Sequence, residues 1–255
     1  MKAKPLLNIN FKLPLCLDTV FIDTSNFVKE NFLEGQKIKE IFRLCYEGHI
    51  QLVMPSITYN EILNRISQNG NEAYNHFKSF RDKTRIFINL PDFSEKFAPF
   101  HRENSIKDLQ ALFKEIITSI NTLMLDYPTL NIGNVFEKYF NDDFPFSTGE
   151  KKSEFPDAFT MVTLEQWCEK NGKKCFVIAA DKDIRQYSNK YLKVENSLEE
   201  YLDSVLRKVD LSVKRKKRME IALKVYNKHK IDLEKSIQTW LIGQLEIKDA
   251  FSKKG

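Results

Sequence analysis

Short apolar runs in this chain alternate with segments in which apolar residues recur every three or four positions. Residues 19–22 and 50–54 are rich in β-branched and other apolar side chains, which is typical of buried strands. Helical spacing follows each run, over residues 27–45 and over residues 57–66, the second behind a predicted Ser56 cap. This order of strand, helix, strand and helix predicts parallel pairing through a right-handed crossover.

The pattern changes between about residues 69 and 150, where long polar stretches with helical spacing are interrupted by prolines. Residues 105–125 predict a helix, and residues 85–90 predict one short strand. We interpret residues 69–150 as a mostly helical insertion over an α/β core.

The α/β pattern returns after the insertion. Pro156 is expected to open a helix, because proline suits the first helical position. Residues 174–180 are the clearest buried strand in the chain, and residues 191–194 predict an edge strand. Ser197 and Glu200 have the spacing of a capping box, which predicts the start of another helix.

These elements predict the fold class and the domains. We expect an α/β fold, a doubly wound parallel sheet flanked by helices, within a domain of residues 1–204. Residues 205–255 are expected to form a basic, helical C-terminal extension. Whether the natural chain continues beyond Gly255 stays open.

The composition is that of a soluble globular protein, with 42% hydrophobic and 29% charged residues among 255. No run approaches the roughly 18 apolar residues of a membrane span, and the N-terminus lacks a secretory pattern. We therefore expect a cytoplasmic protein without a membrane partner.

The cysteines argue against a zinc site. Cys16, Cys45, Cys168 and Cys175 are scattered through apolar stretches without a CxxC pair, and the chain has only four His. We expect reduced cysteines that pack as small core residues.

The net charge of +5 is unevenly distributed. Residues 205–255 contain 14 Lys and Arg against 6 Asp and Glu, a balance of +8, which leaves −3 for residues 1–204. A basic segment favours a polyanionic partner. The run of Lys214, Arg215, Lys216, Lys217 and Arg218 is thus a candidate nucleic-acid patch, with a solvated helix face as the alternative.

Several acidic residues stand where strands or helices would bring them to one edge of the sheet. Asp23 and Asp181 directly follow predicted strands, Glu61 lies in the helix after the second strand, and Asp157 lies in the first turn of a helix; Asp183 stands close to Asp181. Ligands of doubly wound sheets bind at the carboxyl ends of the strands. Crowded carboxylates need a cation, and oxygen-only ligands favour Mg²⁺ or Mn²⁺.

Each assignment has a simpler alternative. Asp23 or Asp183 could cap a helix, Asp157 could complement a helix dipole, and Glu61 could face solvent. The combination of acids favours a metal site over these readings taken singly. The neighbouring residues Lys151 and Lys152 could hold substrate phosphates or form a solvated basic loop.

Four motifs carry a resemblance to a known family. Phe-Ile-Asp-Thr-Ser-Asn, Met-Pro-Ser-Ile-Thr-Tyr-Asn-Glu-Ile, Phe-Pro-Asp-Ala-Phe and Val-Ile-Ala-Ala-Asp-Lys-Asp-Ile resemble the successive acidic motifs of the PIN domain. Their order and flanks are closest to the bacterial PIN-like group DUF4935, over roughly residues 17–204. One departure is Ala179-Ala180, where related chains often have a hydroxyl residue or Asn before the Asp.

The resemblance implies a divalent-metal-dependent nuclease. Asp23, Glu61, Asp157 and Asp181 fall on the metal-binding acids of the family, Asp183 on its common second acid, and Ser25 or Thr24 on the hydroxyl position beside the first acid. Activated water would attack phosphorus in line and leave a 5′-phosphate and a 3′-hydroxyl. RNA is the favoured substrate, with single-stranded DNA as another.

Toxin or phage-defence roles are common in such domains, so an inhibitor or effector protein is a further expected partner. A different class of function also stays open, a non-catalytic nucleic-acid-binding or scaffold module that keeps the fold. The oligomeric state is open as well. Dehalogenase-type phosphatases are excluded because position 25 is Ser instead of a second Asp, and the chain has no glycine-rich phosphate loop.

Overall fold

The structure of the chain is a computed structural model. It describes residues 18–126, 131–146, 154–179, 184, 187–221 and 223–224. The chain divides into two compact units, Met1–Asp203 and Ser204–Gly255. Each unit is described by itself.

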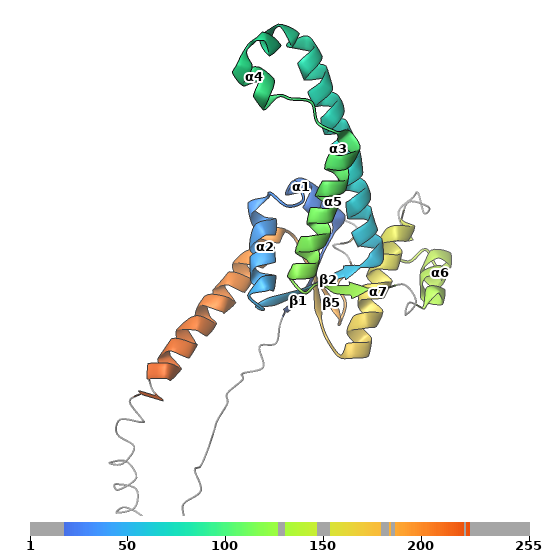
Figure 1. The fold of residues 1–255 in the computed structure, drawn as a ribbon. Coiled ribbons are helices and arrows are strands. Elements are labelled where there is room, and N and C mark those ends of the chain that lie inside the picture. The colour runs from blue at the N-terminus through green and yellow to red at the C-terminus, as the bar shows by residue number, and fades with distance from the viewer. Residues whose placement is uncertain are drawn as a thin grey trace, which may run out of the picture. The chain divides into compact units, whose positions relative to one another are not determined.

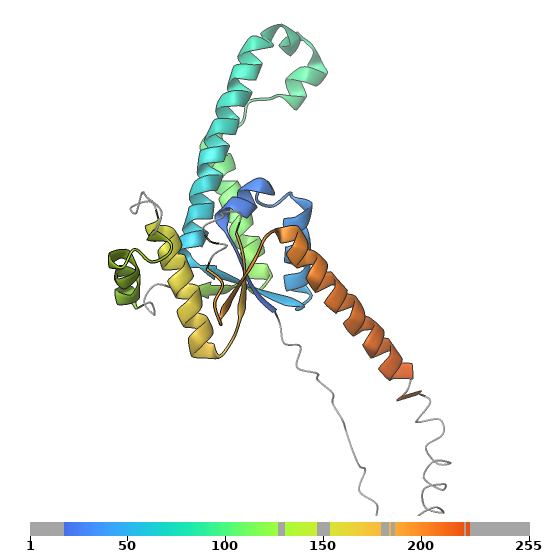
Figure 2. The same ribbon diagram turned by 180° about the vertical axis from the view of Figure 1, so that it is seen from behind.

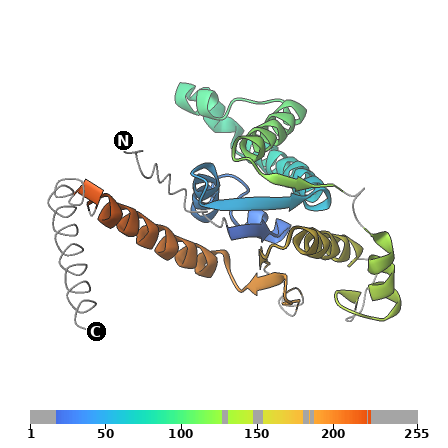
Figure 3. The same cartoon turned by 90° about the horizontal axis from the view of Figure 1, so that it is seen from below.

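The described strands of the first unit form one parallel sheet, which confirms the predicted α/β fold class (Figure 1). The strands are β1 (Asp18–Ile22), β2 (Ile50–Pro55), β3 (Leu123–Leu125), β4 (Cys175–Ile178) and β5 (Leu192–Glu195). Their order in the sheet is β3-β2-β1-β4-β5, and every neighbouring pair is parallel. Figure 3 shows the strands side by side, with α7 beside them.

The strand order reverses at β1. The chain adds β2 and β3 on one side of β1, and later adds β4 and β5 on the other side. Ile22 at the end of β1 pairs with Ile178 at the end of β4, and the next amide, of Asp23, donates a hydrogen bond of 2.9 Å to the Ile178 carbonyl. The carboxyl ends of β1 and β4 therefore meet at a switch point, where doubly wound sheets bind ligands.

Both faces of the sheet are buried. Phe21 and Val177 point to the face covered by α7, where they pack with Met161 and Leu164. Their neighbours in the strands point to the opposite face, where Phe176 contacts the buried Tyr201 with ring centroids 5.4 Å apart. Burial on both faces explains why the strands read as continuous apolar runs instead of alternating ones.

The helices of the first unit connect the strands along the chain and surround the sheet (Figures 1 and 2). They are α1 (Thr24–Lys29), α2 (Gln36–Tyr46), α3 (Ser56–Lys83), the 3₁₀ helix η1 (Arg85–Asn89), α4 (Pro91–Lys96), α5 (Arg102–Ser119), α6 (Ile132–Phe140) and α7 (Phe155–Asn171). Helix α7 begins at Phe155, one residue before the predicted Pro156, which lies in its first turn; it ends at Gly172, whose φ of 60° suits the left-handed cap that glycine favours. Residues 198–203 are also helical, and Ser197 Oγ accepts a hydrogen bond from the Glu200 amide as a cap.

Helices α3 and α5 run side by side away from the sheet, with η1 and α4 at their far end (Figures 1 and 2). Gln110 Nε2 on α5 donates to the Leu63 carbonyl at 3.0 Å and to Ser67 Oγ at 2.8 Å, which ties the two helices together. Near the sheet, Phe113 is fully buried and meets Phe27 edge to face at 5.9 Å.

Three local predictions were wrong. Residues 85–90 contain the 3₁₀ helix η1 instead of a strand, because this exposed run has no neighbouring strand to pair with. The helix predicted over residues 105–125 ends at Ser119, and Leu123–Leu125 pairs with β2 as strand β3. Ser56 is not the cap of α3, because β2 continues through Pro55 and Ser56 Oγ donates to Asp126 Oδ1 at 2.6 Å instead.

The described cysteines behave as predicted. Cys45, Cys168 and Cys175 are buried and form no disulfide, whereas Cys16 lies outside the described residues. Burial raises the pKa of the Cys45 thiol to about 12, so this thiol stays neutral at physiological pH. Across the described residues, no helix is both long and apolar enough to cross a membrane.

In the second unit, residues 204–221 and 223–224 are helical. The run from Lys214 to Arg218 is exposed along this helix. Lys214 Nζ forms an ion pair with Asp210 Oδ2 at 2.6 Å, one turn earlier.

Candidate metal site and pocket

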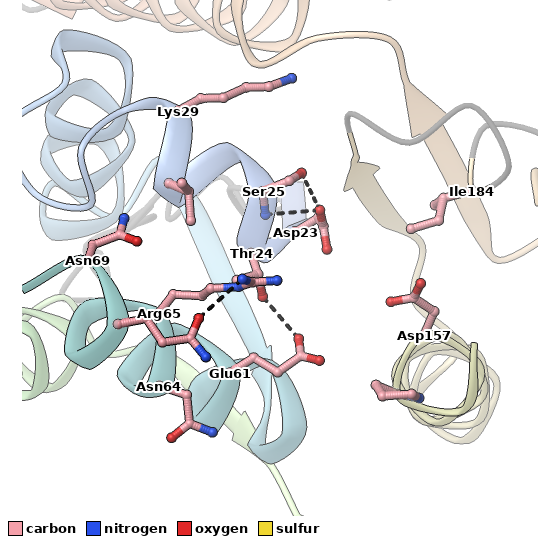
Figure 4. A pocket seen from close by; sticks show the side chains of 13 residues that line it. Asp23, Thr24, Ser25, Lys29, Glu61, Asn64, Arg65, Asn69, Asp157 and Ile184 are labelled. Carbon is pink, nitrogen blue, oxygen red and sulfur yellow. Dashed lines mark hydrogen bonds between the residues drawn. The ribbon is translucent and has the colours of Figure 1, made fainter. Parts of the chain in front are cut away.

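A pocket of about 860 Å³ lies at the carboxyl ends of β1 and β4 (Figure 4). Its walls come from the loop after β1, from α1, from the first half of α3, from the start of α7, and from Ile184. The lining residues are Asp23, Thr24, Ser25, Val28, Lys29, Glu61, Asn64, Arg65, Gln68, Asn69, Pro156, Asp157 and Ile184. Three predicted acids and the predicted hydroxyl residue Ser25 are thus in one pocket.

Asp23 follows β1 directly and is the N-cap of α1. Its Oδ2 accepts a hydrogen bond from the Ser25 amide at 3.1 Å and a second one from the Ser25 hydroxyl. Asp23 therefore caps α1, and this role is compatible with a place in the pocket, because Figure 4 shows the same carboxylate at the pocket wall. Asn26 fixes this turn, since its Nδ2 donates to the Ile178 carbonyl of β4 at 3.1 Å.

Glu61 reaches the pocket from the second turn of α3. Its Oε2 accepts a hydrogen bond from Thr24 Oγ1 at 3.1 Å, which connects α3 to α1. Burial raises the pKa of the Glu61 carboxyl above its ordinary value, and the negative charge of Asp23 adds to this increase. The Thr24 hydrogen bond and the positive charge of Arg65 act in the opposite direction. Glu61 is half-buried and does not face open solvent as the simpler alternative proposed.

Asp157 reaches the pocket from the first turn of α7, directly after Pro156. Figure 4 shows its carboxylate facing Asp23 and Glu61 across the pocket. Helices α3 and α7 are joined near these acids by the buried hydroxyls of Thr58 and Thr160, which are 3.4 Å apart. Each Thr lies one turn from the acid of its own helix, so this contact packs the two acid-bearing turns against each other.

Other predicted site residues lie outside the described residues. These are Asp181, Asp183, Lys151 and Lys152. The nearest described positions beside the two acids are Ala179, which directly follows β4, and Ile184, which lines the pocket. The predicted patch of Lys214 to Arg218 belongs to the second unit.

The donors in the pocket fit a hard divalent cation. Carboxylate and hydroxyl oxygens from Asp23, Ser25 and Glu61 suit Mg²⁺ or Mn²⁺, and among the described lining residues none carries sulfur or imidazole. Within the described ranges, no group of three His, Cys, Asp or Glu side chains is arranged to hold an ion by itself. Mg²⁺ does not require such a group, because it usually keeps several waters and binds through one or two carboxylates.

The sequence reasoning missed the polar wall that α3 gives to the pocket. Asn64, Arg65, Gln68 and Asn69 line the pocket beyond Glu61, and Lys29 lines it from α1. Arg65 Nη1 donates to Gln68 Oε1 at 3.2 Å, which orients its guanidinium. On α3, Asn64 and Arg65 are three and four residues after Glu61, and Gln68 and Asn69 are seven and eight residues after it. This helical spacing places the four residues on one face with Glu61, and it is a signal that could have found them.

The family model of the PIN domain matches residues 20–184, which is more than half of the chain. The chain belongs to the PIN domain family. PIN domains are generally metal-dependent nucleases, so the acidic pocket lies in a domain of a nucleic-acid-associated class. No curated protein and no solved structure matched the chain in the corresponding searches.

The raised pKa of Glu61 predicts how metal-free stability depends on pH. The folded-state pKa of Glu61 lies above its ordinary value of 4.5, so the free energy of unfolding decreases as pH rises from 4.5 to the folded-state pKa. Above the folded-state pKa, the loss of stability from ionised Glu61 is complete. We expect Glu61→Gln to raise the melting temperature of the metal-free PIN domain at pH 8, by on the order of 2 °C. At pH 4 the difference should vanish, because Glu61 is then protonated. Thermal melts of both proteins in EDTA at pH 4 and pH 8 would test this prediction. An equal difference in melting temperature between Glu61→Gln and the wild type at the two pH values would contradict it.

Proposed function

We propose that this PIN domain is a divalent-metal-dependent endonuclease that hydrolyses phosphodiester bonds of RNA. The observation that carries the proposal is the meeting of Asp23, Glu61 and Asp157, from three separate elements, in one pocket at the β1 and β4 switch point. Mg²⁺ or Mn²⁺ is the proposed cofactor. Asp181 and Asp183 complete the proposed ligand set on the resemblance of their motif alone.

A bound divalent ion would supply a Lewis acid that lowers the pKa of water and offsets the negative charge of the scissile phosphate. The chain's own residues set the conditions for this chemistry. Thr24 holds Glu61 by its hydrogen bond, and Ser25 holds Asp23 in the same way. The wall residues Lys29 and Arg65 give the acidic pocket positive charge that can bind phosphate oxygens.

The proposal includes three finer points that rest on the motif resemblance. The products would carry a 5′-phosphate and a 3′-hydroxyl, the chain would fall in the DUF4935 group, and its role would be that of a toxin or a phage-defence effector. The substrate would be RNA in preference to single-stranded DNA.

A cleavage assay with the purified full chain tests the proposal. Fluorescently labelled RNA and single-stranded DNA of mixed sequence would be incubated with Mn²⁺, with Mg²⁺ and with EDTA. We expect cleavage of RNA with either ion, none in EDTA, and recovery when metal is added in excess. Binding of RNA without cleavage under every metal condition would contradict the proposal and support a non-catalytic binding module.

The basic run of the second unit is proposed as a nucleic-acid contact. Changing Lys214, Arg215, Lys216, Lys217 and Arg218 together to Gln should weaken RNA binding, because fewer counterions are released. The slope of log K against log salt should become shallower by up to about 3.5, at roughly 0.7 per phosphate contact of a single strand. Fluorescence anisotropy in EDTA at several salt concentrations would measure both quantities.

A control variant removes exposed positive charge elsewhere. Lys170, Lys173 and Lys174 are exposed near the C-terminal end of α7 and do not line the pocket. Their joint change to Gln should leave the slope nearly unchanged. Equal slopes in the basic-run variant and the wild type would show that the run is not a nucleic-acid contact.

A further inference from the structure

The far end of the α3 and α5 hairpin carries a dense group of aromatic rings. We call residues 74–102, with η1 and α4, the insertion tip (Figure 1). Ring centroids are 4.6 Å apart for Phe93 and Phe97, and 5.4 Å apart for Phe80 and Phe97. The aromatic residues of the tip are Tyr74, Phe77, Phe80, Phe87, Phe93, Phe97 and Phe100.

This group is not a closed core. In η1 and α4, which are fully described, no residue is buried. Phe80, Phe87 and Phe100 are 41%, 49% and 44% exposed, and the aliphatic Ile86 is 73% exposed. A hollow of about 460 Å³ lies at α4 in the tip; it is lined by Leu90, Pro91, Asp92, Phe93, Lys96 and Phe97. An exposed apolar surface of this kind indicates a binding partner.

The charge of the tip indicates which partner. Residues 74–102 contain six Lys and Arg against three Asp and Glu, a balance of +3. The rest of residues 1–204 contain 20 against 26, a balance of −6. Arg81 Nε is buried without a hydrogen-bond partner in the described structure, and Arg102 lies 5.9 Å from the centroid of the Tyr74 ring. A positive, aromatic surface on a negative body complements a polyanion, whereas a second copy of the tip would bring like charges together.

We propose that the insertion tip is a second contact for single-stranded nucleic acid, distant from the pocket. Exposed rings such as Phe87 would stack with bases, and Lys83, Arg85 and Lys96 would contact phosphates, as in other sequence-tolerant single-strand sites. This inference rests on the proposed function, because it assigns the tip to the same substrate. Helix α3 connects the two contacts, since it carries both Glu61 in the pocket and Phe80 in the tip.

The length of α3 fixes the size of substrate that can use both contacts. Glu61 and Phe80 are 19 residues apart on one helix, which corresponds to about 28 Å at 1.5 Å per residue. A stacked strand with about 3.4 Å per nucleotide needs roughly eight nucleotides to cover that distance. Short oligonucleotides therefore cannot occupy the pocket and the tip together.

Binding of a 25-nucleotide single-stranded RNA, measured by fluorescence anisotropy in EDTA, tests the proposal. We expect Phe87→Ala to raise Kd about fivefold or more, the low end of the range for loss of a stacked base. The variant with Lys83, Arg85 and Lys96 changed to Gln should also bind more weakly, with a salt slope shallower by about 2. The matched control is the Lys170, Lys173 and Lys174 variant, and equal thermal melts would verify folding of all variants.

Substrate length gives a second readout. With Mn²⁺, both tip variants should lower kcat/KM for the 25-nucleotide RNA by about tenfold, and a 5-nucleotide RNA should show less than a twofold change. Unchanged Kd values for the 25-nucleotide RNA in both tip variants would overturn the proposal. The proposal would also be overturned if the tip variants lost binding to anionic vesicles, or lost self-association measured by light scattering, while their RNA binding stayed unchanged. Because binding is measured in EDTA, it is independent of cleavage: a failure of the nuclease proposal would leave the tip result readable.

Discussion

Asp23→Asn is expected to lower the rate of RNA cleavage by at least about 100-fold, the loss typical when one charged group that acts on the transition state is removed. Asp23 lies at the switch point and faces the pocket with Glu61 and Asp157. The fold should survive, because Asn is as good an N-cap as Asp and can still accept the hydrogen bonds of Ser25. Single-turnover cleavage with Mn²⁺ measures the loss, and circular dichroism checks the fold.

The control for this change is Asp108→Asn, which removes the same charge from an exposed position of α5, outside both the pocket lining and the insertion tip. Its cleavage rate should stay within about twofold of the wild type. Asp181→Asn should resemble Asp23→Asn if the motif assignment is right. Wild-type rates in Asp23→Asn, in preparations free of contaminating nuclease, would contradict the assignment of this pocket.

Divalent metal should raise the melting temperature of the wild-type protein substantially. An ion that binds only the folded state adds about 2.7 kcal/mol at 100 times its Kd. For a domain of roughly 200 residues this corresponds to a shift of about 5–11 °C. Without metal, burial and, to a smaller extent, the charge of Asp23 raise the pKa of Glu61, so its ionised form is destabilised and the gain should be largest near neutral pH. Scanning calorimetry with increasing Mn²⁺ would measure the shift.

The same titration with Asp23→Asn separates the pocket from other ion-binding sites. That variant should have an equal or higher melting temperature in EDTA, because one repulsive charge is gone. It should respond less to Mn²⁺ than the wild type. Equal metal-induced shifts in the two proteins would mean that the ion binds elsewhere.

The sheet was largely predictable because its strands are buried on both faces. Residues 19–22, 50–54 and 174–180 predicted β1, β2 and β4 to within a few positions. Strand β3 was missed because three residues are too few to show a pattern, and its pairing with β2 fixes it. The prediction of a strand at residues 85–90 was wrong because an apolar run forms a strand only where a partner strand is available, and these residues contain a 3₁₀ helix instead.

The site was predictable only in part. Asp23 follows a strand end, which the sequence displays directly, whereas Glu61 depends on the rotation of α3 about its axis. The spacing of Arg65 from Glu61 was visible, but only the packing of α3 against α1 and α7 shows that this face of the helix lines the pocket. The exposed aromatic tip could not be predicted, because helical spacing does not tell which rings have a partner.

Paramagnetic broadening by Mn²⁺ tests whether the pocket of Asp23, Glu61 and Asp157 binds the divalent ion. Amide spectra of the isotope-labelled protein would be recorded with Mn²⁺ well below the protein concentration. We expect the signals of the pocket residues, including Thr24, Ser25 and Ile184, to broaden first in the wild type and to be spared in Asp23→Asn. Selective broadening of signals remote from the pocket, or the same broadening in both proteins, would contradict it.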